Sequence, residues 1–482
     1  MSSTSVIVAT SSGQIEGVED GGIARFLGVP FAAAPIGDLR FRAPVAHPGW
    51  DAVRPALEPG ATAPQGLYRG VLGEILPTVV VAGDETLNLS IWAPTPAPTD
   101  GAPVMIWIHG GSLAHGSSAL PAYDGGSFAR DGVLFVGINY RVGAEGFSVL
   151  DGADANPGLQ DALAAVRWVH SEIAAFGGDP SRITIAGQSA GGNVVSALLA
   201  SGAVDDLVAG AIIQSGPPSA RPAKRAGRIT AAIAKRLGIA TTRDAFLTKT
   251  ADELVDAQEA TTAGTTPVTG GLGYAIAIDG ALVPVNPEAA LVAGTASSIP
   301  LLLGWTRDEA RLWLTPSGLD RTIGRGHLLA ARIAFRIRRS TLAAYRRAVG
   351  GTHGDLFGAL AQDLLLRVPA LRIAESRVGA DRAPAWLSEF TWPSPVHDLR
   401  AAHAVDLPFV FDRVGSPDAV ALVGSAAPQV LATAVHGDWV RFVRDGDPGW
   451  PRWSTDETVR VYDADGAHEE PLPRADLWRA WG

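Results

Sequence analysis

The sequence contains no cysteine among its 482 residues. This absence excludes disulfide bonds, thiolate nucleophiles, cysteine-ligated zinc and iron–sulfur clusters. The sequence also has no run of 18 or more apolar residues, so no transmembrane helix is predicted. The first residues, MSSTSVIVATSSGQ, include neither a basic region nor an apolar stretch of signal-peptide length, which predicts a cytoplasmic protein.

The sequence also contains fewer basic residues than acidic ones. The 39 Lys and Arg residues are outnumbered by 49 Asp and Glu residues, and the formal net charge is −10. Since binding to phosphates requires a basic surface, no nucleic-acid partner is expected. Residues 322–349 are an exception, with Arg332, Arg336 and Arg339 at helical spacing. A membrane-surface helix and a solvated helix face both fit this segment. We favour the solvated face and expect no membrane partner.

The length alone suggests two or three domains. However, the sequence has no internal repeat and no long linker, and the proline-rich stretch 93–103 has only the length of a loop. We therefore predict one large domain over residues 1–482, with insertions, that acts as a monomer or a homodimer.

Short apolar runs alternate with helical patterns between residues 103 and 216. This alternation is typical of βαβ units and predicts an α/β fold with a mostly parallel sheet. The predicted strands are 104–108, 133–139, 183–186, 211–213 and, later in the chain, 300–304. The predicted helices include 159–176 and 194–199, and residues 216–225 and 260–271 are predicted loops.

One motif indicates chemistry. Gly187, Gln188, Ser189, Ala190 and Gly191 form the only G-x-S-x-G pattern of the chain, between a predicted strand and a predicted helix. In this context the pattern predicts a tight strand-to-helix turn that exposes the serine hydroxyl as a nucleophile. The N–H groups at the start of the following helix would face the negative charge that develops in the reaction.

A second loop complements this serine. Residues 109–112, His-Gly-Gly-Ser, directly follow the predicted strand 104–108. A loop of this type supplies backbone N–H groups to an oxyanion hole. We expect His109 to shape the loop rather than to exchange protons.

Several longer segments resemble the type-B carboxylesterase family, which includes bacterial p-nitrobenzyl esterases and the cholinesterases. The resembling segments are FLGVPFAAAPIGDLRFRAP (26–44), GDETLNLSIWAP (83–94), NYRVGAEGF (139–147) and NPGLQDALAAVRWVHSEIAAFGGDPSRITIAGQSAGG (156–192). The resemblance runs through most of the chain. It implies an α/β-hydrolase fold, with flanking helices and with helical and loop insertions over the active site, and activity as a carboxylesterase.

The resemblance also implies a Ser-Glu-His triad in that chain order. Ser189 is the nucleophile, and the acid is similar in context to Glu309, with Asp308 as the neighbouring alternative. The base matches His403, which is followed by Asp406 and Leu-Pro-Phe. His397 and His436 are the rival histidines, and neither lies in a matching context.

The implied oxyanion donors are Gly111, Ser112 and Ala190, with Gly110 permitting the turn. Ser215 matches a family serine that would hydrogen-bond near the triad. Three residues depart from the family pattern. Gln188 replaces a common Glu and removes a charge, Leu113 replaces an aromatic residue and alters the pocket, and Trp305 replaces a small residue and narrows the site.

The predicted reaction is hydrolysis of a small-molecule carboxylic ester through an acyl-enzyme, without metal or cofactor. Amide, carbamate or polyester hydrolysis on the same triad is an alternative. A catalytically dead, cholinesterase-like binding protein is a remote alternative, because Ser189, Glu309 and His403 are all present.

Overall fold

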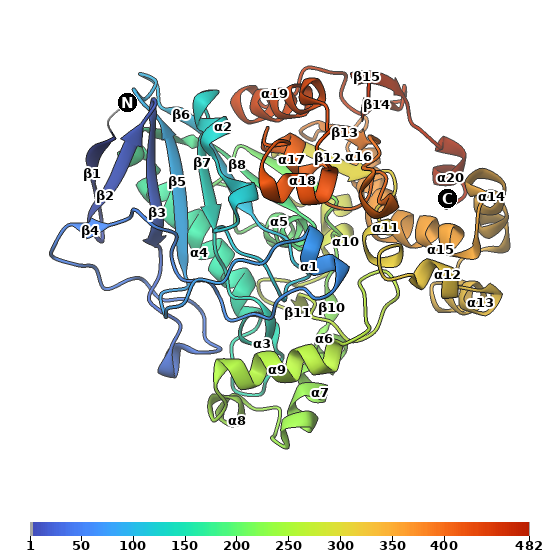
Figure 1. Ribbon diagram of the computed structural model, residues 1–482, viewed down its shortest axis with the longest axis horizontal. Helices are drawn as coiled ribbons and strands as arrows, with labels where there is room; N and C mark the ends of the chain where they lie inside the picture. Colours follow the sequence, from blue (N-terminus) through green and yellow to red (C-terminus); the bar gives the residue numbers. More distant parts are fainter. Residues whose placement is uncertain (1–2, 482) are drawn as a thin grey trace.

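A large twisted sheet crosses the molecule and carries helices on both faces (Figure 1). The computed structural model describes residues 3–481, so both ends of the predicted 1–482 domain lie outside the described residues. The strand order is β1-β2-β3-β5-β7-β6-β8-β9-β12-β13-β14-β15, and β4 pairs with β2. Pairing is parallel from β7 to β14 and antiparallel at both edges, as β1–β2 and β14–β15 illustrate. The mostly parallel core is as predicted.

The strands of this sheet are β1 (Thr4–Thr10), β2 (Gly13–Asp20), β3 (Ile23–Pro30), β4 (Arg54–Pro55), β5 (Asn88–Pro94), β6 (Ala102–Ile108), β7 (Leu134–Ile138), β8 (Gly178–Gln188), β9 (Gly210–Gln214), β12 (Leu301–Thr306), β13 (Ala385–Phe390), β14 (Thr458–Asp463) and β15 (Gly466–Pro471). A separate parallel pair consists of β10 (Arg221–Pro222) and β11 (Ala277–Ile278).

Alternate residues of the central strands enter two different cores, as the two-residue period of a strand requires. On β6, Ile106 and Ile108 pack in one core, and Met105 and Trp107 pack in the other. The first core contains α4 (Pro157–Glu172), α5 (Ala190–Ser201), α10 (Pro287–Ala293) and α16 (Val368–Glu375). The second contains α2 (Gly126–Arg130), α17 (Leu407–Val410) and α19 (Gln429–Asp445). Helices therefore cover both faces of the sheet.

The remaining helices lie in the connections. They are α1 (Val71–Ile75), α3 (Gly143–Phe147), α6 (Ala223–Ala226), α7 (Arg228–Leu237), α8 (Arg243–Leu247), α9 (Ala251–Thr262), α11 (Arg311–Leu314), α12 (Leu319–Thr322), α13 (Arg325–Ala334), α14 (Arg339–Val349), α15 (His353–Gln362), α18 (Pro417–Val423) and α20 (Ala475–Arg479). Short 3₁₀ turns are η1 (Gly37–Leu39), η2 (Pro121–Tyr123), η3 (Ile173–Phe176) and η5 (Val396–Asp398), and η4 (Asp363–Arg367) is π-helical.

The structure corrects three local predictions. The predicted loop 216–225 includes β10 and the start of α6, and the predicted helix 322–349 is divided into α13 and α14. The predicted strand 183–186 is longer at both ends, because β8 begins at Gly178, which pairs with β6, and ends at Gln188. In residues 3–481, no helix has the length and apolar character needed to cross a bilayer.

A fully buried ion pair links the loop after β7 to α4. The Arg141 guanidinium donates from Nε and Nη2 to the two carboxylate oxygens of Asp161, both at 2.7 Å. The Arg141 backbone N–H donates to the same carboxylate at 3.0 Å. The side chains of Arg141 and Asp161 are 1% and 0% exposed, so removing either partner leaves an unpaired charge in the core.

We therefore expect Asp161→Asn to lower the free energy of unfolding by about 3–5 kcal/mol, measured by urea denaturation. The control is Asp445→Asn, which breaks a surface pair with Arg444 whose side chains are about half exposed. That change should cost less than about 1 kcal/mol. Equal losses in the two variants would contradict a special contribution from the buried pair.

Candidate active site

The turn between β8 and α5 holds Ser189 in an unusual backbone conformation. Its φ is 58° and its ψ is −122°, a combination that non-glycine residues rarely adopt. Ser189 lies at the N-cap of α5, and its hydroxyl lies at a pocket in the protein. The backbone of this turn is the geometry that the G-x-S-x-G pattern predicts.

The glycines around Ser189 allow close approach of other backbone segments. A Cβ at Gly191 would lie 1.9 Å from the carbonyl oxygen of Ile108, at the end of β6. A Cβ at Gly187 would lie 2.5 Å from the carbonyl carbon of Gly191. Both distances are far below van der Waals contact, so any larger residue would displace the turn.

The two other triad candidates meet beside this turn. His403 Nδ1 lies 2.5 Å from Glu309 Oε2, and both side chains are nearly fully buried. The other carboxylate oxygen of Glu309 accepts the backbone N–H of Thr306 at 2.8 Å. The carboxylate is thus fixed at both oxygens, and it fixes the plane of the imidazole.

The structure distinguishes these residues from their rivals. Asp308 points elsewhere; burial raises the pKa of its carboxyl, and its backbone N–H donates to Ala401. His397 is exposed on η5, and His436 is held by Val410 and Asp131. Of the three candidate histidines, only His403 lines the pocket with Ser189.

The loop that is expected to bind the oxyanion directly follows β6. Gly110, Gly111 and Ser112 line the same pocket as Ser189. Gly111 has a φ of +118°, and a Cβ there would lie 2.1 Å from the carbonyl oxygen of His115, so the position requires glycine. Among residues 3–481, the backbone N–H groups of Gly111, Ser112 and Ala190 have no protein acceptor.

His109 supports this loop from below. It is fully buried, its ring is stacked on Tyr140 at 4.5 Å, and its Nδ1 lies 2.8 Å from the carbonyl oxygen of Gly110. Burial lowers the pKa of His109 to about 4, so the ring is neutral at physiological pH. These contacts agree with the predicted structural role.

Two neighbours of the triad behave differently from one another. Gln188 Nε2 lies 3.1 Å from His403 Nε2, the imidazole nitrogen on the side away from Glu309. Gln188 therefore keeps a polar contact at the site, as expected. Ser215 is buried, but its hydroxyl has no hydrogen-bond partner among residues 3–481. The hydrogen bond expected from Ser215 near the triad is therefore not formed; its backbone N–H instead bonds Gly304.

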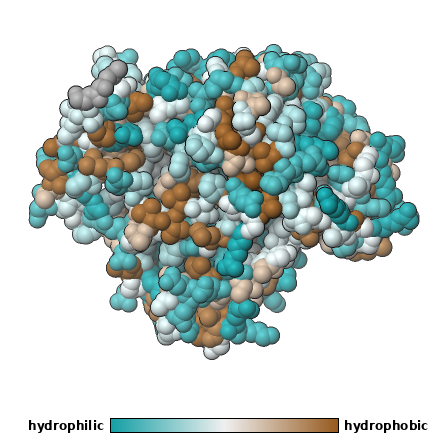
Figure 2. All heavy atoms as spheres, in the orientation of Figure 1, coloured by the Kyte–Doolittle hydropathy of each residue, from teal (hydrophilic) through white to brown (hydrophobic). Residues whose placement is uncertain are grey.

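The pocket is mostly apolar. Figure 2 shows hydrophobic residues gathered near the middle of the face on which α1 and α18 lie. The apolar lining comes from α1, α11, α17, α18 and adjacent loops, and includes Leu72, Ile75, Leu76, Leu120, Leu312, Trp313, Leu407 and Leu422. The ring of Trp313 lies 4.7 Å from the His403 ring, so α11 covers the imidazole. Sequence reasoning did not identify Trp313.

Two expected effects on the pocket are wrong. Trp305 is buried on β12 and does not line the pocket; instead, the guanidinium of Arg367 lies 5.8 Å from its ring centre. Leu113 is 3% exposed and packs in the core rather than at the pocket wall. The inward alternation of β12 and the turn after Gly111 direct these side chains away from the cavity.

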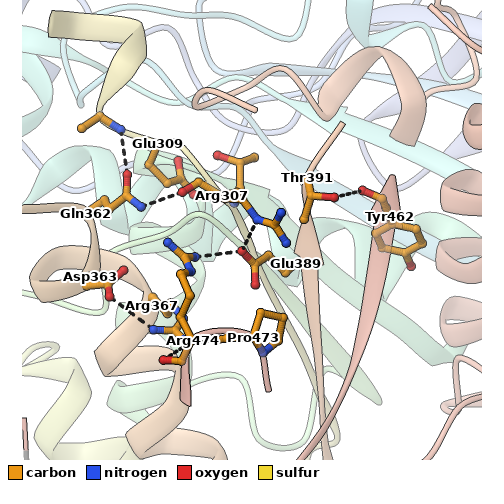
Figure 3. A network of polar contacts seen from close by, with 12 residues as sticks. Arg307, Glu309, Gln362, Asp363, Arg367, Glu389, Thr391, Tyr462, Pro473 and Arg474 are labelled. Atoms are coloured by element: carbon orange, nitrogen blue, oxygen red, sulfur yellow. Dashed lines mark hydrogen bonds and ion pairs between the residues drawn. The ribbon is translucent and has the colours of Figure 1, made fainter. Parts of the chain in front are cut away.

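The loop that carries Glu309 is braced from behind (Figure 3). Gln362 donates to the carbonyl oxygen of Arg307 at 2.7 Å and accepts the N–H of Ala310 at 3.4 Å. The Arg307 side chain donates to Glu389 at 3.1 Å. Gln362 lies where α15 passes into the π-helical turn η4, and it fixes the residues on both sides of the acid.

Glu389 holds the Arg307 side chain in place. It is fully buried on β13 and also accepts Arg474 at 2.8 Å (Figure 3). Burial alone raises the pKa of its carboxyl, but Arg474, Arg307 and Arg367 outweigh this effect and hold the pKa below the usual value. Glu389 is therefore ionised, and the acid loop rests on a paired internal charge. No sequence motif indicated this group.

Asp406 is a second buried carboxyl near the triad. It is 1% exposed, its polar neighbour is the side chain of Gln214, and it forms no ion pair among residues 3–481. Burial, together with the charge of Glu309, raises the pKa of Asp406 to about 7. Its carboxyl therefore keeps its proton in the folded protein at a pH where it is ionised in the unfolded chain.

This raised pKa means that folding loses stability as the pH rises from about 4 to about 7, because the unfolded chain releases the proton first. Asp406→Asn cannot ionise and avoids the loss. We expect the free energy of unfolding of the variant, relative to wild type, to increase by about 2–4 kcal/mol between pH 4 and pH 8. Urea denaturation at both pH values measures the change. The exposed substitution Asp51→Asn should show none, and a flat difference for Asp406→Asn would contradict the prediction.

Among residues 3–481, no group of three or more His, Asp or Glu side chains is placed to hold a metal ion.

The parallel sheet, the turn after β8 and the loop after β6 define the α/β-hydrolase fold. Solved structures agree: a carboxylesterase of Geobacillus stearothermophilus is 32% identical and superposes with a TM-score of 0.87, over 99% of this chain and 100% of that one.

The carboxylesterase family model matches residues 4–465. The chain belongs to this family and is a carboxylic ester hydrolase. It is 32% identical to the para-nitrobenzyl esterase of Bacillus subtilis over 95% of this chain and 94% of that protein. It is 33% identical to the phenmedipham hydrolase of Pseudarthrobacter oxydans over 96% of each protein. The family resemblance inferred from the sequence is confirmed.

Proposed function

We propose that the protein is a serine carboxylesterase that hydrolyses small-molecule esters through an acyl-enzyme on Ser189. The observation that carries this proposal is the convergence on one pocket of a strained serine, an imidazole bonded to a buried carboxylate, and unpaired backbone N–H groups. The proposal covers the chain as one catalytic domain. The cytoplasmic location and the monomeric or homodimeric state stay predictions.

In the first step, His403 Nε2 takes the proton of Ser189 as the serine oxygen attacks the ester carbonyl. Glu309 holds the opposite nitrogen, Nδ1, and stabilises the imidazolium that forms. The oxyanion accepts hydrogen bonds from the N–H groups of Gly111, Ser112 and Ala190. His403 then gives the proton to the leaving alcohol, and the acyl group stays on Ser189.

In the second step, water attacks the acyl-enzyme. His403 removes a proton from this water, the same N–H groups stabilise the second tetrahedral intermediate, and the proton returns to the serine oxygen as the acid leaves. The chemistry needs only side chains and backbone groups of this chain. An ester group in an apolar pocket also loses its competing water, which strengthens each of these polar contacts.

The apolar lining of the pocket favours esters with hydrophobic acyl or alcohol groups. Relatives named for different substrates, a para-nitrobenzyl esterase and a phenmedipham hydrolase, match this chain almost equally well. We therefore propose that the wall residues on α1, α11 and α18, rather than the triad, set the preference among esters.

We expect Ser189→Ala to lower kcat for p-nitrophenyl acetate by at least about 10⁴-fold, because the oxyanion hole cannot replace the nucleophile. Steady-state hydrolysis measures the loss, and labelling by an organophosphate followed by peptide mass analysis identifies the modified residue. Ser215→Ala is the matched control, since Ser215 is buried nearby without a bond to the triad. Activity in Ser189→Ala close to wild type, or a label on another residue, would exclude the proposed nucleophile.

The contact between Gln188 and the imidazole generates a pH prediction. In Gln188→Glu, a carboxylate beside Nε2 would stabilise the imidazolium, the form that cannot accept the serine proton. The acidic midpoint of the kcat/KM profile should therefore move to higher pH by about 1–3 units. Gln188→Met, which keeps the volume without a charge, should leave the midpoint in place. An unchanged midpoint in Gln188→Glu would show that this side chain does not act on the base.

A further inference from the structure

A strongly basic segment lies outside the lining of the pocket. Residues 321–354 contain eight arginines and no Asp or Glu, although the chain as a whole carries a net charge of −10. This segment includes α13 and α14, which lie at the edge of the molecule near the C-terminus (Figure 1). A local excess of this size attracts anions.

The same segment exposes large apolar side chains. Leu329, Ile333 and Phe335 are 52%, 64% and 55% exposed, and Phe335 is the only Phe, Trp or Tyr among the exposed large hydrophobic residues of the described chain. Leu328 is the only buried residue of α13, which therefore rests on the body along a narrow edge. We call Leu329, Ile333 and Phe335 with Arg325, Arg332 and Arg336 the α13 patch.

Four residues of the α13 patch lie on α13, and Phe335 and Arg336 directly follow its last residue, Ala334. Arg325 and Leu329 are four residues apart, as are Leu329 and Ile333, and residues with this spacing share a helical face. Arg332 follows Leu329 by three residues and therefore lies beside it on the helix surface. None of Arg325, Arg332 and Arg336 forms an ion pair within residues 3–481. The face thus offers apolar groups and unpaired cations together.

Basic residues continue beyond the end of α13. Phe335 lines a pocket with Arg221, Arg225 and Arg228, which come from β10, α6 and the start of α7. All three arginines are exposed. The cationic surface therefore spans two chain segments that are about a hundred residues apart in sequence.

From these observations we infer that the α13 patch binds the surface of an anionic lipid bilayer. An interfacial helix is typically amphipathic and rich in Arg, with its apolar side chains in the acyl boundary and its cations at the headgroups. A soluble polyanion would satisfy the arginines but leave Ile333 and Phe335 in water. A second copy of the chain would bring two strongly cationic patches together, which charge repulsion opposes. The bilayer alone satisfies both parts of the patch, in contrast to the solvated helix face expected from the sequence.

The test is sedimentation of the full-length protein with vesicles of phosphatidylcholine alone or mixed with phosphatidylglycerol, at low and high salt. We expect binding to the mixed vesicles at low salt, little binding to neutral vesicles, and loss of binding at high salt, because salt screens the charges. No binding to the mixed vesicles, or equal binding to neutral ones, would overturn the inference.

Matched variants locate the contact. Ile333→Glu combined with Phe335→Glu should weaken binding by at least about tenfold. The control is Val430→Glu, because Val430 on α19 is 64% exposed, as is Ile333, and lies outside the patch. Equal weakening by the control, or none by the double variant, would overturn the assignment to α13.

A second pair of variants tests the charges. Arg332→Glu with Arg336→Glu should weaken binding by at least about tenfold, since each cation near an anionic bilayer contributes about fivefold. Arg167→Glu with Arg452→Glu gives the same net charge from exposed positions elsewhere and should retain most of the binding. Equal losses in both pairs would indicate net charge alone and overturn the inference.

Hydrolysis of p-nitrophenyl acetate without vesicles should be unchanged in all these variants. The inference is thus independent of the proposed triad. Capture by dextran sulfate without capture by vesicles would instead identify an acidic polymer as the partner and overturn the lipid assignment.

Discussion

The close approach of two backbones, at Gly191 and Ile108, is the constraint on which the site depends. It brings the turn after β8 against the end of β6, and the oxyanion loop begins at the very next residues. The strained conformation of Ser189 is stable only because this contact and the paired strands around it hold the turn. Ser189, the proposed nucleophile, and the N–H groups proposed to bind the oxyanion are thus positioned by the same packed backbone.

The sequence was most informative where strands are buried on both faces. Strands β6 and β12 are almost continuous apolar runs, so their existence could be predicted from residue type alone. The antiparallel strands β1–β3 and β14–β15 could not, because no more than half of the side chains in each of these strands are fully buried. The predicted helix 322–349 is too long, because the periodicity of the residues does not mark the break at Phe335.

The residues of the candidate site also differ in whether the sequence could predict them. Ser189 stands in a local motif. The family resemblance was needed to select Glu309 and His403, since residue type alone left Asp308 open as the acid. Gln362, Glu389 and Trp313 have no such motif; their contacts to the acid loop and to the imidazole arise from packing across 50 to 90 residues of sequence. For Ser215 and Trp305 the predicted contact with the site is wrong, since a matched position in the sequence does not fix the direction of a side chain.

The loops that carry Glu309 and His403 are joined by hydrogen bonds between their main chains. Asp308 N–H donates to Ala401 O, and His403 N–H donates to Glu309 O. These bonds do not depend on the side chains that line the pocket on α1 and α18. Mutation and selection can therefore replace wall residues, or change the length of the loops that carry them, while the geometry between Glu309 and His403 is retained. For an enzyme engineer, the wall is the region to randomise, and the paired loops are the region to leave unchanged.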